Sequence, residues 1–104
     1  MDKKIIHISA FISSAMAISP EDGEKLFKEI YNALQQKKQV ELDFSGIDIL
    51  VSVFLNNSIG KLYGTEFKNA FDTEQIIVSH MSEQDKATLL LVQKRAKDFF
   101  ANRE

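Results

Sequence analysis

The fold follows from residues 40–62, which read Val40-Glu41-Leu42-Asp43-Phe44-Ser45-Gly46-Ile47-Asp48-Ile49-Leu50-Val51-Ser52-Val53-Phe54-Leu55-Asn56-Asn57-Ser58-Ile59-Gly60-Lys61-Leu62. Val40, Leu42 and Phe44 alternate with polar residues, which predicts a strand with one buried and one polar face. The pair Ser45-Gly46 is typical of a turn, because glycine adopts positive φ at little cost. After an apolar run over 47–51, Ser52 is well placed as the N-cap of a helix over 52–62.

The flanking segments supply further strands and helices. Residues 4–12 are rich in isoleucine and predict a strand, and residues 13–18 predict a connector or a short second strand. Ser19-Pro20 followed by two acids is typical of a helix start, and an apolar stripe at three-to-four spacing continues to Leu34. Beyond the central stretch, residues 65–74 predict one helical turn or a packed loop, 76–79 a short strand, and Ser82 the start of a last helix.

The predicted order is strand, helix, strand, helix, strand, helix. Helices between consecutive strands imply crossover connections, and therefore a parallel or mixed sheet with helices packed on it. We predict an α/β fold, with a single small mixed sheet and packed helices, in one domain over residues 1–104. The apolar fraction of 44% is sufficient for a core without metal or disulfide support.

The composition argues against several classes of function. The formal net charge of −2 arises from 13 basic and 15 acidic residues, which disfavours nucleic acid or an anionic membrane as the main partner. The chain has no cysteine, which excludes disulfides, thiolate chemistry and cysteine-based zinc sites. Its apolar runs are far shorter than the roughly 20 residues of a membrane span, and the N-terminus lacks a signal-peptide pattern. We therefore expect a cytoplasmic protein.

The sequence contains no enzyme signature. It lacks a glycine-rich phosphate loop, a nucleophile elbow and a histidine pair at metal-binding spacing. Asp43 is interpreted as a cap or hydrogen-bond acceptor near the turn, because local spacing places no base or second carboxylate beside it. His7 is interpreted as a packing or surface residue, and His80 as a solvent-facing residue at a strand end. We expect no catalytic residue, no metal and no cofactor.

At this point the central stretch becomes specific, because Leu42-Asp43-Phe44-Ser45-Gly46-Ile47, followed by Ser52 at a helix start and a glycine further along, resembles STAS domains. These are the sulphate-transporter and anti-sigma-factor-antagonist modules, and the STAS-like family of unassigned function is the closer match. Ala17-Ile18-Ser19-Pro20 and Ile76-Ile77-Val78-Ser79 also fit, so the resemblance covers most of the chain.

The resemblance implies a bacterial-type signalling module that binds a protein partner and is switched by phosphorylation. In the anti-sigma-factor antagonists, a kinase with the histidine-kinase ATPase fold phosphorylates a serine at the start of this helix, and the added charge ends the docked state. The matching residue is Ser52, although Val51 and Val53-Phe54 replace the aspartate and the serine-glycine that flank it in those antagonists. A plain N-cap is the alternative role of Ser52. The partner-binding residues implied are Asp43, Ser45, Gly46, Ile47, Asp48, Ile49, Leu50, Ser52, Asn56, Asn57 and Ser58.

Two functions from different classes remain open. The leading hypothesis is a non-enzymatic regulatory module that docks a protein partner, a histidine-kinase-type ATPase, through residues 45–62. The alternative is a structural or self-associating subunit, for instance a homodimer, which is suggested by Leu90, Leu91, Phe99 and Phe100. An enzyme is the third reading, in which nucleotide binds at the Gly46 turn.

Overall fold

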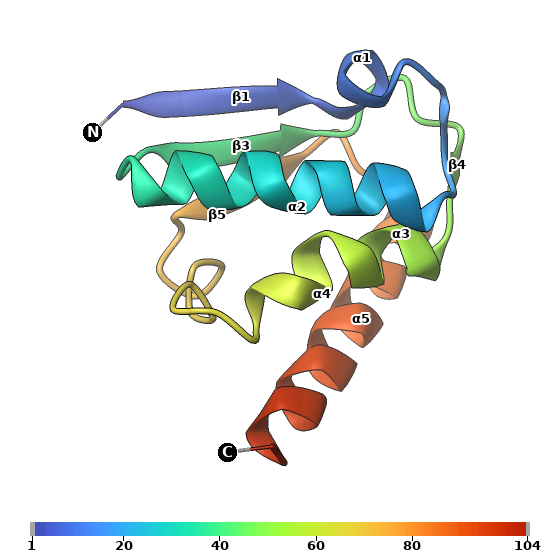
Figure 1. Cartoon of the computed structure of the whole chain (residues 1–104). Helices are drawn as coiled ribbons and strands as arrows, with labels where there is room; N and C mark the ends of the chain where they lie inside the picture. The colour runs from blue at the N-terminus through green and yellow to red at the C-terminus, as the bar shows by residue number, and fades with distance from the viewer. Residues whose placement is uncertain (1, 104) are drawn as a thin grey trace.

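The computed structural model describes residues 2–103, and Figure 1 shows the arrangement of the elements. In chain order they are β1 (Lys3–His7), α1 (Ile8–Ile12), β2 (Met16–Ala17), α2 (Pro20–Gln35), β3 (Gln39–Asp43), β4 (Ile49–Leu50), α3 (Ser52–Asn57), α4 (Ile59–Leu62), β5 (Ile76–Ser79) and α5 (Glu83–Ala101).

Three strands form the main sheet, in the order β1-β3-β5, and both pairings are parallel. The short strands β2 and β4 form a separate parallel ladder. The α/β class is therefore confirmed, but the sheet is parallel rather than mixed, and a second ladder accompanies it. The reason is that helical crossovers return the chain to the same end of the sheet before each new strand. The carboxyl ends of β1, β3 and β5 consequently meet at one edge.

The core lies on one face of the main sheet. Ile6, Val40, Leu42 and Ile76 point into it and are at most 4% exposed. They join one buried cluster with helix residues, which include Leu26, Ile30, Phe54, Leu55, Leu89 and Val92. Figure 1 shows α2 running alongside the strands. The opposite face is largely polar, because Glu41 on β3 pairs with Lys3 at 2.6 Å and accepts a hydrogen bond from Ser79 at 2.7 Å.

The helix start at Ser19 is confirmed. The Ser19 side chain accepts a hydrogen bond from the Asp22 amide at 3.0 Å, and Pro20 occupies the first helical position. The last helix begins in the same way, because Ser82 accepts a hydrogen bond from the Asp85 amide at 3.1 Å. Both helix starts were therefore predicted for the right reason, because each serine makes the N-cap hydrogen bond that its sequence context indicates.

The strand predicted over 4–12 is wrong in its second half. β1 ends at His7, whose register partner Asp43 ends β3, and the chain then turns into α1. Ile8 and Ile12 are four positions apart, so they share one face of this helical turn, and Ile8 is fully buried. The isoleucine-rich pattern of residues 8–12 is compatible with a strand or a helix. It becomes helical because the pairing of β1 with β3 ends at His7 and Asp43, so the residues beyond have no strand partner in the main sheet.

The single helix predicted over 52–62 is also wrong, because it is divided into α3 and α4. Ser58 stands at the break with φ −109° and ψ −84°, outside the helical region. It is fully buried, and its hydroxyl donates a hydrogen bond to the Phe54 carbonyl at 2.8 Å. The following residues 63–75 form a series of turns, which agrees with the packed loop predicted over 65–74.

Candidate functional site

A carboxylate and two imidazoles meet at the carboxyl edge of the sheet. His7 is the last residue of β1, Asp43 is the last residue of β3, and His80 directly follows β5. His7 Nδ1 lies 3.0 Å from Asp43 Oδ2, and His80 Nδ1 lies 2.9 Å from Asp43 Oδ1. We call these three residues the His-Asp-His cluster. Parallel pairing creates it, because the three strands end side by side.

Asp43 is held at the centre of this cluster. Its side chain is 10% exposed, whereas those of His7 and His80 are 63% and 66% exposed. Asp43 Oδ1 also accepts a hydrogen bond from the Ser45 amide at 2.9 Å. That bond is the largest cause of a pKa well below the usual range of aspartate; burial opposes it, and the two histidine contacts lower the pKa further. The carboxylate is therefore negatively charged at neutral pH.

The interpretation of Asp43 as a hydrogen-bond acceptor near the turn is confirmed, but the sequence reasoning missed its two imidazole partners. His80 is more than a solvent-facing strand end, and its φ of 56° lies in the left-handed region that non-glycine residues rarely adopt. A signal existed for two of the three residues, since Asp43 and His80 fall next to the end of a predicted strand, whereas His7 lies in the middle of the strand predicted over 4–12. Chemically, Nδ1 of both rings is engaged with Asp43, so Nε2 is the nitrogen left for another group.

His80 also lines a depression of about 450 Å³ beside this edge. The loop over 44–50 forms one wall, and Ser82, Gln84 and Asp85 at the start of α5 form another. Among residues 2–103, no group of three or more histidines, cysteines or acids is arranged to hold a metal ion. None of the described helices has both the length and the apolar character required to cross a bilayer.

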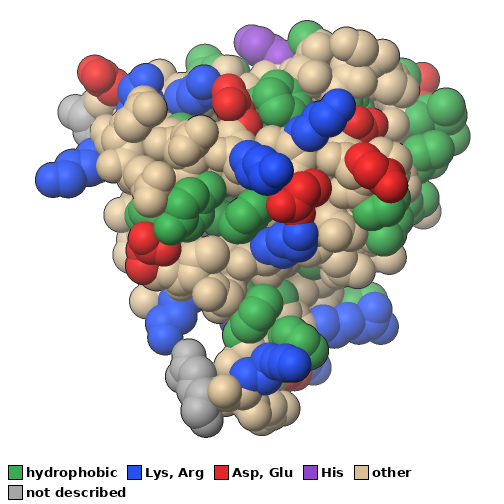
Figure 2. All heavy atoms as spheres, viewed as in Figure 1, with side chains coloured by type: hydrophobic (Ala, Val, Ile, Leu, Met, Phe, Trp, Pro, Cys, Tyr) green, Lys and Arg blue, Asp and Glu red, His purple; other side chains and the backbone are tan. Residues whose placement is uncertain are grey.

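Beyond the turn, apolar side chains are exposed on the β2–β4 ladder. Met16 pairs with Ile49, and their side chains are 45% and 48% exposed. Ile18 follows at 42%, and Val53 in the first turn of α3 at 38%. We call these four residues the loop face. Figure 2 shows hydrophobic side chains gathered at the right-hand side of the molecule, where Figure 1 places β4.

The structure distributes the predicted partner-binding residues unevenly. Asp43 and Ser58 are buried, which removes the Ser58 side chain from the surface. The partly buried residues are Ile47, Leu50 and Asn57, and the exposed ones are Ser45, Gly46, Asp48, Ile49, Ser52 and Asn56. Of the exposed set, Ile49 belongs to the loop face, Ser52 directly precedes Val53 of that face, and Asn56 lines a different depression, between α4 and α5.

Ser52 is not the N-cap of α3. Val51 occupies that position, no side-chain cap hydrogen bond is present, and Ser52 is the first helical residue. The Val51 amide donates a hydrogen bond to the Ala17 carbonyl at 3.1 Å and the Val51 backbone is extended, so the helix begins directly after it, one residue earlier than an N-cap at Ser52 predicts. Ser52 is exposed, and it directly precedes Val53 of the loop face in the first turn of α3.

Comparison with known proteins gives one match. A family model described as a STAS-like domain of unknown function matches residues 22–86, which is more than half of the chain. Searches of curated proteins and of solved structures found no match. The matched segment runs from the start of α2 to the start of α5, so it includes Asp43, Ser52 and His80.

Proposed function

Because the chain belongs to the family of STAS-like domains of unknown function, we propose that it is a non-enzymatic regulatory module that docks a protein partner through the loop face. The proposed partner is a kinase-like ATPase of the histidine-kinase type, and the proposed location is the cytoplasm. Phosphorylation of Ser52 would end the docked state. The partner and the switch come from the resemblance to anti-sigma-factor antagonists.

The observation that carries this proposal is the set of apolar side chains exposed around Ser52. Single exposed apolar residues are common, but a contiguous group beside polar residues is typical of an interaction surface. Met16, Ile49 and Ile18 lie on the same side of the ladder, since alternate residues point the same way, and Ala17 on the other side is fully buried. The ladder is thus apolar on both sides, although only one contacts the core.

The position of Ser52 supports a switch by charge. A phosphoryl group adds about −1.5 to −2 charges at neutral pH. Because Ser52 directly precedes Val53, that charge would have to lose its hydration when a partner covered the loop face, and the four residues of the loop face include no cation to compensate it. Phosphorylation would therefore oppose docking without requiring a change in the fold.

The experiment is affinity capture from lysate with a pair of matched variants, followed by mass spectrometry. Ile49→Glu introduces a charge into the loop face, and Ile5→Glu introduces the same charge at an isoleucine of equal exposure, 48%, in β1. We expect Ile49→Glu to lose the ATPase partner and Ile5→Glu to retain it. Retention by both variants, or loss by both with folded circular-dichroism spectra, would contradict docking at the loop face. Ser58 is unsuitable as a test position, because a charge there would be buried.

A second function, self-association, is favoured by α5. Leu90, Leu91 and Phe99 are 68%, 47% and 55% exposed, so this helix carries apolar residues both toward the core and away from it. Light scattering across a concentration series separates the two functions. A dimer that Leu90→Glu dissociates would support self-association, and a monomer at high concentration would leave the docking module as the function.

A further inference from the structure

A second depression, distinct from the loop face, lies between α4 and α5. We call it the α4–α5 groove, and it measures about 340 Å³. One wall is formed by Asn56, Gly60 and Lys61, and the other by Arg95, Ala96, Phe99 and Phe100. Phe99 is 55% exposed and packs edge to face against Phe100, with ring centroids 5.0 Å apart. The groove therefore offers an aromatic surface.

The apolar surface continues along α5 beyond the groove. Leu91 is 47% exposed and lies one helical turn before Arg95, which in turn lies one turn before Phe99. Residues four apart share a helix face, so these three side chains form one stripe. Its length from Leu91 to Phe99 is about 12 Å, or roughly two helical turns at about 1.5 Å per residue. Two turns of a partner helix match this length.

The charge of the groove has one sign. Its lining contains two cations, Lys61 and Arg95, and no carboxylate. The surrounding segment, residues 94–103, holds four cations and one acid, Asp98, although the whole chain has a net charge of −2. Positive charge is therefore concentrated at this end of α5, where it can attract an acidic ligand.

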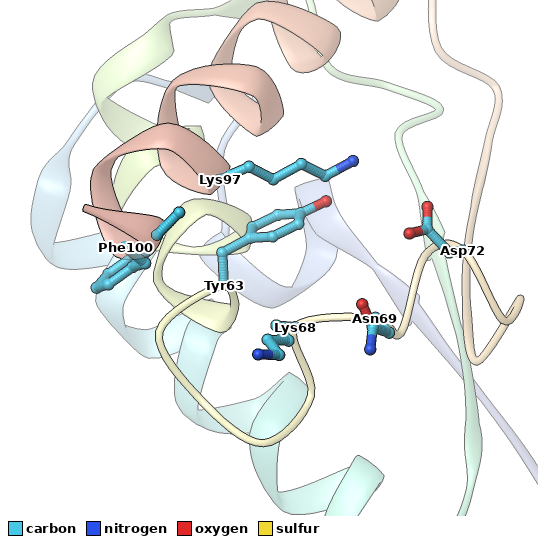
Figure 3. Close-up of a pocket in the computed structure, with 7 residues that line it drawn as sticks. Tyr63, Lys68, Asn69, Asp72, Lys97 and Phe100 are labelled. Atoms are coloured by element: carbon cyan, nitrogen blue, oxygen red, sulfur yellow. The ribbon is translucent and has the colours of Figure 1, made fainter. Parts of the chain in front are cut away.

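The cations in and around the α4–α5 groove differ in the groups that they contact. Lys61 pairs with Glu24, and the Arg103 guanidinium lies 4.7 Å from the Phe99 ring centroid. Lys97 Nζ lies 5.8 Å from the Tyr63 ring centroid, and Figure 3 shows its side chain extended along that ring. Within residues 2–103, Arg95 makes no ion pair, so its guanidinium is available to a carboxylate.

We propose that the α4–α5 groove binds an acidic amphipathic helix of a partner protein. The apolar side of that helix would contact Phe99 and Leu91, and its carboxylates would pair with Arg95 at the rim. Helices recognised in this way are read through anchors at three-to-four spacing, which the stripe on α5 matches. A nucleic acid or anionic membrane is disfavoured, because the acidic net charge of the chain would repel either one outside this small region.

The test starts with selection of about 16-residue peptides from a random display library on the full chain, and the affinities of the enriched peptides are then measured by fluorescence polarisation. We expect acidic peptides with leucine or aromatic residues at three-to-four spacing. Arg95→Glu should weaken their binding at least about tenfold. The matched control is Lys94→Glu, which makes the same charge change at the neighbouring exposed position, and it should weaken binding less than about threefold.

A second pair isolates the apolar contact. Phe99→Ala should weaken the same peptides, whereas Leu90→Ala, at a residue 68% exposed and on another side of α5, should not. Enrichment of basic or neutral peptides, or of none, would overturn the proposal. Equal effects of the two charge variants would also overturn it, since they would indicate general electrostatic attraction. Tighter Arg95-dependent binding of an oligonucleotide, anionic vesicles or a second copy of the chain would assign the groove to that ligand instead.

Discussion

His80 Nδ1 lies 2.9 Å from Asp43 Oδ1, although 37 positions separate the two residues in the sequence. His7 approaches the other oxygen of the same carboxylate from 36 positions away on the N-terminal side. One aspartate at the end of β3 thus connects the ends of the two flanking strands. The Ser45 amide, which also donates to Asp43, links this cluster to the turn that leads to the loop face.

The first prediction concerns the charge on Asp43. Asp43→Asn should lower the free energy of unfolding by about 1–3 kcal/mol at neutral pH, because the bonds from Ser45 and the histidines lose their charged acceptor. A carboxyl whose pKa is lower in the folded chain stabilises the fold fully above its unfolded pKa, about 4. That contribution is lost as pH falls toward the lower folded pKa. The difference between wild type and variant should therefore narrow below pH about 4.

Urea denaturation at a series of pH values measures this difference. Asp48→Asn is the control, because Asp48 is exposed and, within the described part of the chain, its side chain forms no ion pair. It should change the free energy of unfolding by less than about 0.5 kcal/mol. A difference for Asp43→Asn that stays constant into acid, or that widens there, would contradict the role assigned to the charge.

Local patterns predicted the elements well, and contacts between distant segments explain most of what they missed. Ser19 and Ser82 could be identified because a cap bond depends on residues only three positions apart. His80 could not be paired with Asp43 from local spacing, since the two residues meet only after the crossover from β3 to β5 has been made. The break at Ser58 has the same origin, because a buried site between packed helices overrides the helical preference of its neighbours.

The second prediction separates true N-caps from serines that resemble them. Ser82→Ala should lower the free energy of unfolding by about 1 kcal/mol, because the Asp85 amide loses its acceptor. Ser52→Ala should have an effect below about 0.5 kcal/mol, since Ser52 makes no cap bond. Thermal and chemical denaturation of both variants provide the measurement. A loss of similar size at Ser52 would place the start of α3 one residue later.

The third prediction concerns the close approach of α2 to α3. A methyl group at Gly23 would lie 2.6 Å from the Phe54 carbonyl oxygen, which is shorter than any normal contact. Gly23→Ala should therefore lower the free energy of unfolding by about 1–3 kcal/mol, despite the better helix propensity of alanine.

Gly60→Ala is the control for Gly23→Ala. Its methyl group would have ordinary contacts, with Val92 Cγ1 at 3.6 Å, so the change should be neutral or should stabilise by up to about 1 kcal/mol. Chemical denaturation of the two variants in parallel gives the comparison. If Gly23→Ala proved as stable as Gly60→Ala, α2 and α3 would not pack as closely as described.

The last prediction tests the switch separately from the docking. Ser52→Glu adds one negative charge directly before Val53 of the loop face, and it should weaken binding of the captured partner at least about tenfold, because the charge must be desolvated against apolar side chains. The fold should persist, since an acid in the first turn of a helix interacts favourably with its dipole. Asn32→Asp, at an exposed position of α2, adds the same charge elsewhere and should leave binding unchanged. If Ser52→Glu binds like wild type while Ile49→Glu does not, the loop face docks the partner but Ser52 is not its switch.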